Sequence, residues 1–232
     1  MNSSNYLKRK ELKYKLNYDQ YIELKNMMES YMCIDKNKKH KISNIYFDTA
    51  DYKVIIASME KPIYKEKLRI RKYSTSDSIF IELKKKYKGI VYKKRVDLDK
   101  EKLNDNIFSL ETKNQTNCEI NHFLEKYEEM DARVYLSYDR EAYFCKDDDS
   151  FRMTFDSNIL FRDTNVSLEL DDKHDLCVLE DNVFILEVKA AGSLPAWLIS
   201  FLSEKKIYRS SFSKYAEAYK KFIFPKLRES RR

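Results

Sequence analysis

The chain has 232 residues, of which 43% are hydrophobic and 36% are charged, and its 45 basic and 38 acidic residues give a net charge of +7. This length allows one domain, or two at most, with a substantial hydrophobic core. The two glycines, Gly89 and Gly192, exclude both the glycine-rich P-loop and the three-glycine dinucleotide fingerprint. Side chains must therefore bind any phosphate or nucleotide.

Neither the cysteines nor the histidines form a recognisable site. The four cysteines are far apart and include no CxxC pair, which favours reduced thiols over disulfides. The three histidines have no metal-ligand spacing, and we expect them in polar, loop-like surroundings. These residues are Cys33, Cys118, Cys145 and Cys177, and His40, His122 and His174.

The N-terminal residues MNSSNYLKRK are not followed by an apolar segment, so no signal peptide is predicted. No stretch of the sequence approaches the roughly eighteen apolar residues that a membrane span needs. We therefore expect a cytoplasmic protein without membrane insertion.

The chain is predicted to begin with a strand and a helix. Residues 9–16 alternate between charged and apolar side chains, as a strand with one charged face does. Asn17 suits the N-cap of a helix over residues 18–30, in which Tyr21, Leu24 and Met28 fall on one apolar stripe.

A basic segment, KNKKHK at residues 36–41, is typical of a solvated turn. Residues 42–48 then predict a strand, and residues 52–59 predict a short helix.

Three strands are predicted between residues 67 and 98, with Gly89 in the turn between the second and third. Each strand has one side that is almost entirely charged, and a period of two places these sides on one surface. Because like charges opposite each other destabilise a sheet, this surface indicates a polyanionic ligand. A solvated outer face is the alternative.

Polar residues with a helical pattern follow, and they predict an insert of helices at about residues 100–129. Residues 133–146 and 151–162 predict two strands joined by a turn, and residues 182–191 predict a last strand. The C-terminal part, at about residues 195–224, is expected to be helical, with Pro195 in a first helical turn.

These elements predict an α+β fold in a single domain over residues 1–232. About eight strands with few crossover helices favour an antiparallel sheet with helices packed outside. We expect this sheet to close into a barrel, because side chains alternate between the interior and the exterior along every barrel strand. The charged sides would line the interior.

The predicted interior surface combines many cations with a few acids. Confined cations are costly unless anions neutralise them, and phosphate chains suit both arginine and lysine. The cations are Lys13, Arg69, Arg71, Lys84, Lys86, Lys93, Arg95, Arg140, Arg152 and Lys189, and the acids are Glu11, Glu82, Asp156 and Glu187. Glu187 stands on an otherwise apolar strand, so we predict it as a ligand of Mg²⁺ or Mn²⁺, with an ion pair as the alternative.

Eight short motifs follow one another from Arg9 to about Lys221: RKELKYKL, SNIYFDTADY, LRIRKY, IELKKK, YDREAY, FRMTFDSNI, ILEVK and SFSKYAEAY. In these motifs the sequence resembles a known family, the vacuolar transporter chaperone (VTC) domain. That domain is a polyphosphate polymerase of the triphosphate tunnel metalloenzyme superfamily, and is related to the CYTH proteins. The resemblance therefore implies a tunnel fold and phosphoryl transfer.

Specific residues and partners follow from the resemblance. It implies that the γ-phosphate of ATP passes to polyphosphate or a pyrophosphate primer, with Mn²⁺ or Mg²⁺ as cofactor and a membrane-protein partner. The catalytic cations that it implies are Lys13, Arg69, Arg71, Lys84, Arg140, Arg152 and Lys214, and the implied metal ligand is Glu187. We expect further substrate contacts from Lys86, Lys93, Arg95 and Lys189.

One departure bears on the choice within the superfamily. The resemblance to CYTH triphosphatases would require ExExK, but Lys13 occupies the second acidic position after Glu11, which favours the polymerase branch. The first alternative is an inorganic triphosphatase or polyphosphatase with water as the acceptor. The second is a non-catalytic module that binds polyphosphate or nucleic acid, since 18 tyrosines could stack on bases. Interleaved acids argue against nucleic acid as a partner.

Overall fold

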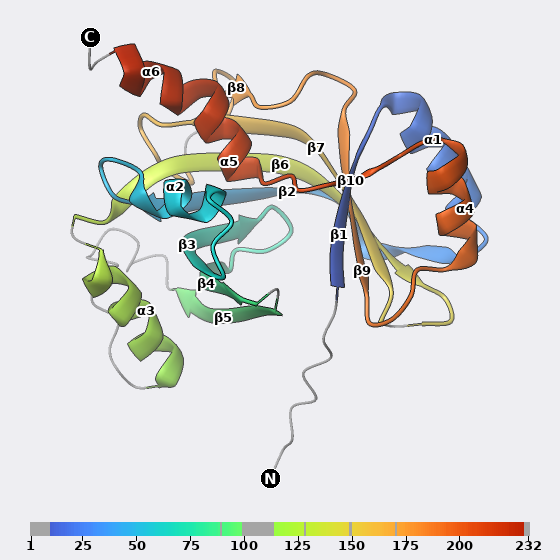
Figure 1. The fold of residues 1–232 in the computed structure, drawn as a ribbon, viewed down its shortest axis with the longest axis horizontal. Helices are drawn as coiled ribbons and strands as arrows, with labels where there is room; N and C mark the ends of the chain where they lie inside the picture. The colour runs from blue at the N-terminus through green and yellow to red at the C-terminus, as the bar shows by residue number, and fades with distance from the viewer. Residues whose placement is uncertain are drawn as a thin grey trace. The chain divides into compact units, whose positions relative to one another are not determined.

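The computed structural model describes residues 10–88, 90–98, 114–127, 129–148, 150–169 and 171–229 (Figure 1). The chain divides into two compact units. The first comprises Met1–His40, Tyr138–Ile159 and Leu179–Ser213, and the second comprises Lys41–Ser137, Leu160–Val178 and Lys214–Arg232. Three strands supply residues to both units: β2 (Met32–Asp48), β6 (Asp131–Cys145) and β7 (Arg152–Arg162).

The first unit is built on an antiparallel arrangement of strands in the order β10-β1-β9-β7-β6-β2. Its own strands are β1 (Lys10–Leu16), β9 (Phe184–Ala190) and β10 (Arg209–Ser210). The register places Lys13 of β1 opposite Glu187 of β9, and Glu187 opposite Thr154 of β7. Charged and polar side chains thus lie in one row across three strands.

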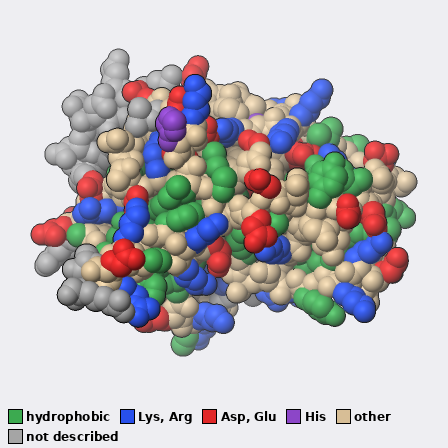
Figure 2. Space-filling model, turned by 90° about the horizontal axis from the view of Figure 1, so that it is seen from above, with side chains coloured by type: hydrophobic (Ala, Val, Ile, Leu, Met, Phe, Trp, Pro, Cys, Tyr) green, Lys and Arg blue, Asp and Glu red, His purple; other side chains and the backbone are tan. Residues whose placement is uncertain are grey.

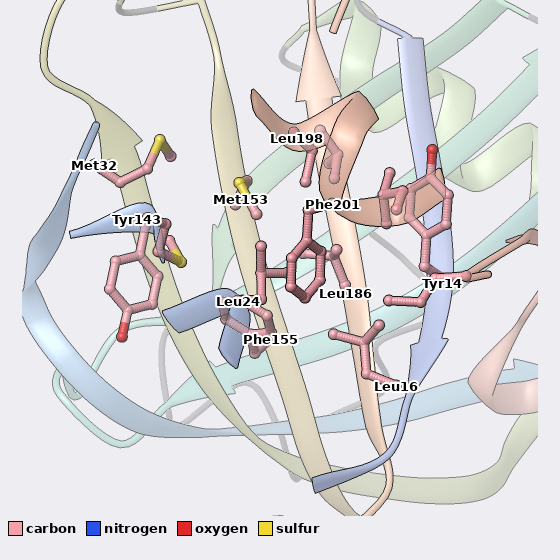
Figure 3. Close-up of a cluster of buried hydrophobic side chains, with 14 of the residues drawn as sticks. Tyr14, Leu16, Leu24, Met32, Tyr143, Met153, Phe155, Leu186, Leu198 and Phe201 are labelled. Atoms are coloured by element: carbon pink, nitrogen blue, oxygen red, sulfur yellow. The ribbon is translucent and has the colours of Figure 1, made fainter. Parts of the chain in front are cut away.

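Two helices belong to the first unit, α1 (Tyr18–Met28) and α4 (Ala196–Glu204). As predicted, Asn17 caps α1, and it forms a capping box with Gln20. Both helices pack on the apolar side of the strands, and Figure 3 shows side chains such as Leu24, Phe155 and Phe201 pointing toward one another in this core. Because the core takes one side of the strands, the charged side faces the other way.

The second unit contains the antiparallel strands β3 (Tyr64–Tyr73), β4 (Ile79–Tyr87) and β5 (Ile90–Leu98), which neighbour β2 in the order β2-β3-β4-β5. A short strand, β8 (Leu176–Cys177), pairs with β7. Apolar residues of one face, including Leu68, Ile81 and Leu83, are fully buried in a core.

The helices of the second unit are α2 (Lys53–Met59), α3 (Gln115–Lys126), α5 (Lys214–Ala218), the π-helix η2 (Tyr219–Ile223) and α6 (Phe224–Glu229). Helix α3 lies within the insert predicted at about residues 100–129. Residues 100–113 and 128 of that insert, and Gly89 of the predicted turn, lie outside the described residues. None of the described helices is long and apolar enough to cross a membrane.

The fold confirms a mostly antiparallel sheet with helices, but it corrects the expected closure. Among the described residues, β10 and β5 each pair with a single strand, so the strand order is open rather than that of a closed barrel. A sequence pattern of period two specifies which side of a strand is charged, but carries no information on whether the end strands pair.

The predicted basic turn at residues 36–41 is wrong, since these residues belong to the 17-residue strand β2. Within this segment Lys38 has a positive φ of 46°, which is uncommon for a residue other than glycine. In the described part of the chain, β3 pairs with β2 only over residues 42–47, so the preceding part of β2 is a sheet edge. Lysines are common on such edges because charge discourages pairing with other chains.

The prediction that the histidines lie in loop-like surroundings is wrong for two of them, because His40 lies in β2 and His122 lies in α3. All four cysteines are free thiols.

Candidate functional site

Five charged residues of the first unit lie together around a carboxylate on β9, that of Glu187. We call Glu11, Lys13, Arg140, Asp156 and Glu187 the Glu187 cluster. Lys13 Nζ lies 3.1 Å from Glu187 Oε1 and 3.5 Å from Glu11 Oε1. Arg140 Nη2 donates to the other oxygen of Glu187, Oε2, at 3.1 Å. The Glu187 side chain is only 9% exposed, so both of its oxygens are held in a buried position by cations.

Arg140 is oriented by a second carboxylate. Its Nε and Nη2 each donate to one oxygen of Asp156, both at 2.6 Å, and Asp156 is fully buried. Burial alone would lower the pKa of Arg140. The negative charges around it, that of Asp156 foremost, together outweigh burial and hold that pKa well above its ordinary value. Burial likewise acts to lower the pKa of Lys13. The negative charges of Glu187 and Glu11 outweigh burial, so the pKa of Lys13 is raised above its ordinary value. Both cations therefore stay charged, as phosphate binding needs.

Two more predicted cations of the first unit lie in the next row of the same side of the sheet, two residues along the strands from Glu187 and Thr154. Arg152 of β7 is opposite Lys189 of β9, and Lys189 is opposite Glu11 of β1. Arg152 is exposed, whereas Lys189 is half-buried. The strands thus place these two residues next to the Glu187 cluster on its charged side.

The second unit contains its own group of cations around a carboxylate. We call Arg69, Arg71, Glu82, Lys93 and Arg95 the Glu82 cluster. The strand register puts Arg69 of β3, Glu82 of β4 and Arg95 of β5 directly opposite one another. Arg69 donates from Nε and Nη2 to Glu82 Oε2 at 3.0 and 2.7 Å, and Arg95 donates from Nε and Nη2 to Oε1 at 2.9 and 2.6 Å.

Glu82 serves as the common counterion of this cluster. Lys93 Nζ lies 2.6 Å from Oε1, Arg71 Nη1 lies 3.8 Å from Oε2, and the Glu82 side chain is 1% exposed. Burial acts to raise the pKa of Glu82, but Arg69, Arg71 and Lys93 together hold it well below its ordinary value. One carboxylate cannot neutralise four cations, so the cluster has an excess of positive charge.

Polar residues of β2 extend the Glu82 cluster. Arg71 Nε donates to Asn44 Oδ1 at 2.9 Å, and the amide of Asn44 donates to the backbone oxygen of Leu136 at 3.0 Å. Arg69 Nη1 donates to the hydroxyl of Tyr46 at 3.0 Å. Neighbouring side chains therefore fix both guanidinium groups, and little conformational freedom remains to be lost when an anion binds.

Tyr46 has an unusual acidity. Burial acts to raise its pKa, but the charges of Arg69, Arg71 and Lys67 outweigh burial and lower the pKa to about 8. A phenol that ionises so close to neutral pH reports the positive potential of this site.

A buried carboxylate attaches helix α5 to the same region. Asp48 accepts hydrogen bonds from the backbone amides of Val54 and Ile55 in α2 and from the hydroxyl of Tyr215 in α5, the last at 2.8 Å. The ring of Tyr215 lies 4.9 Å from that of Tyr46. These contacts fix the start of α5, where the predicted catalytic residue Lys214 is located.

The remaining predicted cations of the second unit lie farther along the same strands. Lys84 is opposite Lys67 on one side and Lys93 on the other, and Lys86 is opposite Lys65. Lys84 is half-buried and Lys86 is exposed. The strands therefore extend a row of lysines away from Glu82.

The donor chemistry of Glu187 fits one kind of metal site. Among the described residues, no group of three or more His, Cys, Asp or Glu side chains could hold a metal ion. Mg²⁺ is often bound by one or two carboxylates, while substrate phosphates and water supply the other oxygens. Glu187 fits a metal bound in this way, but it does not fit a site made of protein ligands alone.

Sequence reasoning missed two residues that contact the Glu82 cluster, Asn44 and Tyr46. Asn44 and Tyr46 alternate along β2, and the same period of two could have placed them on the charged side. The sequence predicts Asp156 as an acid of the charged side. Its ion pair with Arg140 forms because β6 and β7 are adjacent strands in the sheet, and the spacing of residues in the sequence does not predict that adjacency.

The comparisons with known proteins cover nearly the whole chain. The family model of the VTC domain matches residues 8–223. A solved structure of a candidate adenylate cyclase from Bacillus halodurans is similar, with a TM-score of 0.56 and 14% identity, over 93% of this chain and 99% of that one. A candidate adenylyl cyclase from Hippeastrum, described as having a dominant triphosphatase activity, is similar with a TM-score of 0.50 and 17% identity, over 89% of this chain and 94% of that one.

No curated protein matches the chain. At these identities the solved structures show a shared fold alone.

Proposed function

The chain belongs to the VTC domain family, and from this premise we propose that it is a metal-dependent phosphotransferase. It transfers the γ-phosphate of ATP to a growing chain of inorganic polyphosphate or to a pyrophosphate primer, and releases ADP. The observation that carries this proposal is the Glu82 cluster, in which one buried carboxylate partly neutralises four cations. A polyanion supplies the charge that this cluster lacks.

The proposal gives each predicted residue a task. Residues of both clusters bind phosphate oxygens, since arginine offers paired donors and lysine a point charge. The phosphate-binding catalytic residues are Lys13, Arg69, Arg71, Lys84, Arg140, Arg152 and Lys214, and the further substrate contacts are Lys86, Lys93, Arg95 and Lys189.

The reaction needs no nucleophile from the protein. A terminal phosphate oxygen of the acceptor forms a bond to the γ-phosphorus of ATP, and the bond from that phosphorus to the β–γ bridging oxygen breaks. Catalysis of such a transfer depends on positioning and on electrostatic stabilisation. Arginines that are already held by Glu82, Asn44 and Asp156 reduce the cost of this positioning.

Glu187 is the residue that would hold the metal ion, with substrate phosphates as the other ligands. When bound, Mg²⁺ or Mn²⁺ supplies a Lewis acid that offsets charge on the phosphate groups. Lys13 and Arg140, which contact the two oxygens of Glu187 in the structure, would bind phosphate oxygens beside that ion.

The test is to incubate the purified protein with ATP and Mn²⁺ and to measure polyphosphate and ADP. Polyphosphate formed together with ADP is the expected result. Release of free phosphate without chains would instead support the hydrolase, an alternative favoured by the description of the Hippeastrum protein. Tight binding of polyphosphate with no turnover of any triphosphate would support a binding module.

The substitution Glu187→Gln tests the metal assignment. It keeps the shape of the side chain but removes its charge, so metal-dependent turnover is expected to be lost. Full metal-dependent turnover in this variant would overturn the assignment. Lys13→Ala, measured in parallel, is expected to weaken substrate binding at every metal concentration.

Nucleic acid is not expected as a partner. On the face that Figure 2 shows, Lys and Arg side chains are interspersed with Asp and Glu, so no continuous basic surface is present there. A cytoplasmic location and a membrane-protein partner are part of the proposal.

A further inference from the structure

Thr154 of β7 stands in the middle of the charged side of the first unit. It is directly opposite Glu187 in the strand register, and Arg152 and Asp156 are two residues away on its own strand. Its neighbours Met153 and Phe155 point into the core, so Thr154 faces the Glu187 cluster. The hydroxyl group is therefore surrounded by residues to which the proposed function gives phosphate and metal contacts.

The hydroxyl of Thr154 has no hydrogen-bond partner among the described residues, although the residue is only 9% exposed. Its neighbours are fully engaged with each other instead: Arg140 joins Asp156 to Glu187, and Lys13 pairs with the other oxygen of Glu187. A buried polar group without a partner costs folding free energy, so it calls for an explanation. Valine has nearly the same shape and would avoid this cost.

A ligand that satisfies the hydroxyl provides this explanation. We propose that Thr154 is a further phosphate-binding residue, whose hydroxyl donates a hydrogen bond to an oxygen of the bound phosphate chain. A phosphate oxygen that is bound by Lys13 and Arg140 comes within the same group of side chains. The inference rests on the proposed function, and it adds a neutral donor to a site that otherwise binds by charge.

This role predicts opposite effects on stability and on binding. In Thr154→Val the unfavourable buried hydroxyl is gone, so the melting temperature without ligand is expected to be unchanged or higher. A hydrogen bond to a charged oxygen is lost at the same time, so the Kd for inorganic tripolyphosphate is expected to rise by about 10-fold or more. Thr154→Ser keeps the hydroxyl, and its Kd is expected to stay within roughly threefold of the wild type.

The matched control is Ser137→Ala. The hydroxyl of Ser137 is also buried, but it donates to Asp172 Oδ2 at 3.2 Å. Its loss is expected to lower the melting temperature and to leave the Kd for tripolyphosphate unchanged. The comparison separates a hydroxyl that stabilises the fold from one that is kept for a ligand.

The experiment is isothermal titration calorimetry with inorganic tripolyphosphate, together with thermal unfolding of the free proteins. Three results would overturn the role of Thr154 alone: the valine variant binds as the wild type does, the valine variant melts lower than the wild type, or the serine variant binds as weakly as the valine variant. Failure of the wild type to bind tripolyphosphate would overturn the proposed function together with this inference.

Discussion

Arg140 and Asp156 meet in a paired interaction, in which Nε and Nη2 of the arginine donate to separate carboxylate oxygens at 2.6 Å each. Asp156 is fully buried and Arg140 nearly so. A guanidinium held from one side in this way presents its remaining donor edge in a fixed direction. The pair therefore links the stability of the first unit to the direction from which Arg140 can bind an anion.

The first prediction concerns Asp156→Asn. The substitution removes the two short hydrogen bonds that the buried carboxylate accepts and leaves Arg140 with Glu187 alone, at 3.1 Å, so we expect the free energy of unfolding to fall by about 3 kcal/mol. Denaturant unfolding measures this change. The control is Glu217→Gln, which removes an exposed pair with Lys220 and should cost less than about 0.5 kcal/mol. Equal losses in the two variants would contradict the importance of burial at Asp156.

The second prediction concerns the pH dependence of stability at Glu82. Its carboxyl pKa is lower in the folded protein than the ordinary value of 4.5, so its ionised form stabilises the folded state above that pH. As the pH falls below 4.5, the carboxylate in the unfolded chain takes up protons first, and the stabilisation is lost.

Denaturant unfolding of the wild type and Glu82→Gln checks this prediction. At neutral pH the wild type should be more stable by about 3 kcal/mol or more, because the variant leaves the cations without a counterion. At about pH 3 the difference should shrink markedly. A difference that does not depend on pH would show that Glu82 does not act through its charge.

The third prediction concerns Tyr46, whose phenol has a pKa of about 8 between the charges of Arg69, Arg71 and Lys67. Tyr46 therefore ionises more easily in the folded protein than in the unfolded chain. The phenolate form stabilises the folded state at high pH, and this stabilisation is lost as the pH falls through 8. A bound phosphate chain repels the phenolate. The affinity for tripolyphosphate should therefore decrease as the pH rises through 8.

The substitution Tyr46→Phe should remove this step in affinity near pH 8, which a series of binding titrations at different pH values can detect. Tyr208→Phe is the control, because Tyr208 is 78% exposed. A step of the same size in Tyr46→Phe would assign the titration to another group.

The fourth prediction concerns Arg69 and Arg71. Each donates charge-assisted hydrogen bonds, so the double substitution to alanine should weaken tripolyphosphate binding by about 100-fold at low salt. It should also reduce the dependence of the affinity on salt concentration, because fewer charges take part. The control is Lys126→Ala, which removes a cation that pairs with Glu66 outside the Glu82 cluster. Unchanged affinity in the double variant would remove the phosphate-binding role of the cluster.

The sequence predicted the charged side of the sheet well because this property depends on a period of two. Arg69, Arg71, Lys93 and Arg95 alternate along their strands, and the structure brings them together. The VTC resemblance is confirmed by the family match over residues 8–223. Both results use local information, namely the spacing of residue types and the order of short motifs.

The sequence did not predict how the charges are compensated. Glu82 meets Arg69 and Arg95 only because of the register of three strands, and a shift by one residue would turn it to the other side. The cations were expected to depend on a ligand for neutralisation, whereas the structure shows that Glu82 supplies part of it. The open strand order and the edge position of residues 36–41 likewise depend on pairing between distant segments.

The hydrogen bond between Tyr215 and Asp48 joins residues 167 positions apart in the chain. Loop closure over such a length is slow compared with the formation of a helix or a hairpin. During synthesis from the N-terminus, Asp48 and the start of α2 are made long before Tyr215. Helix α5 and Lys214 at its first position can therefore dock only when the whole segment between Asp48 and Tyr215 has been made, so the order of synthesis delays assembly of this part of the site.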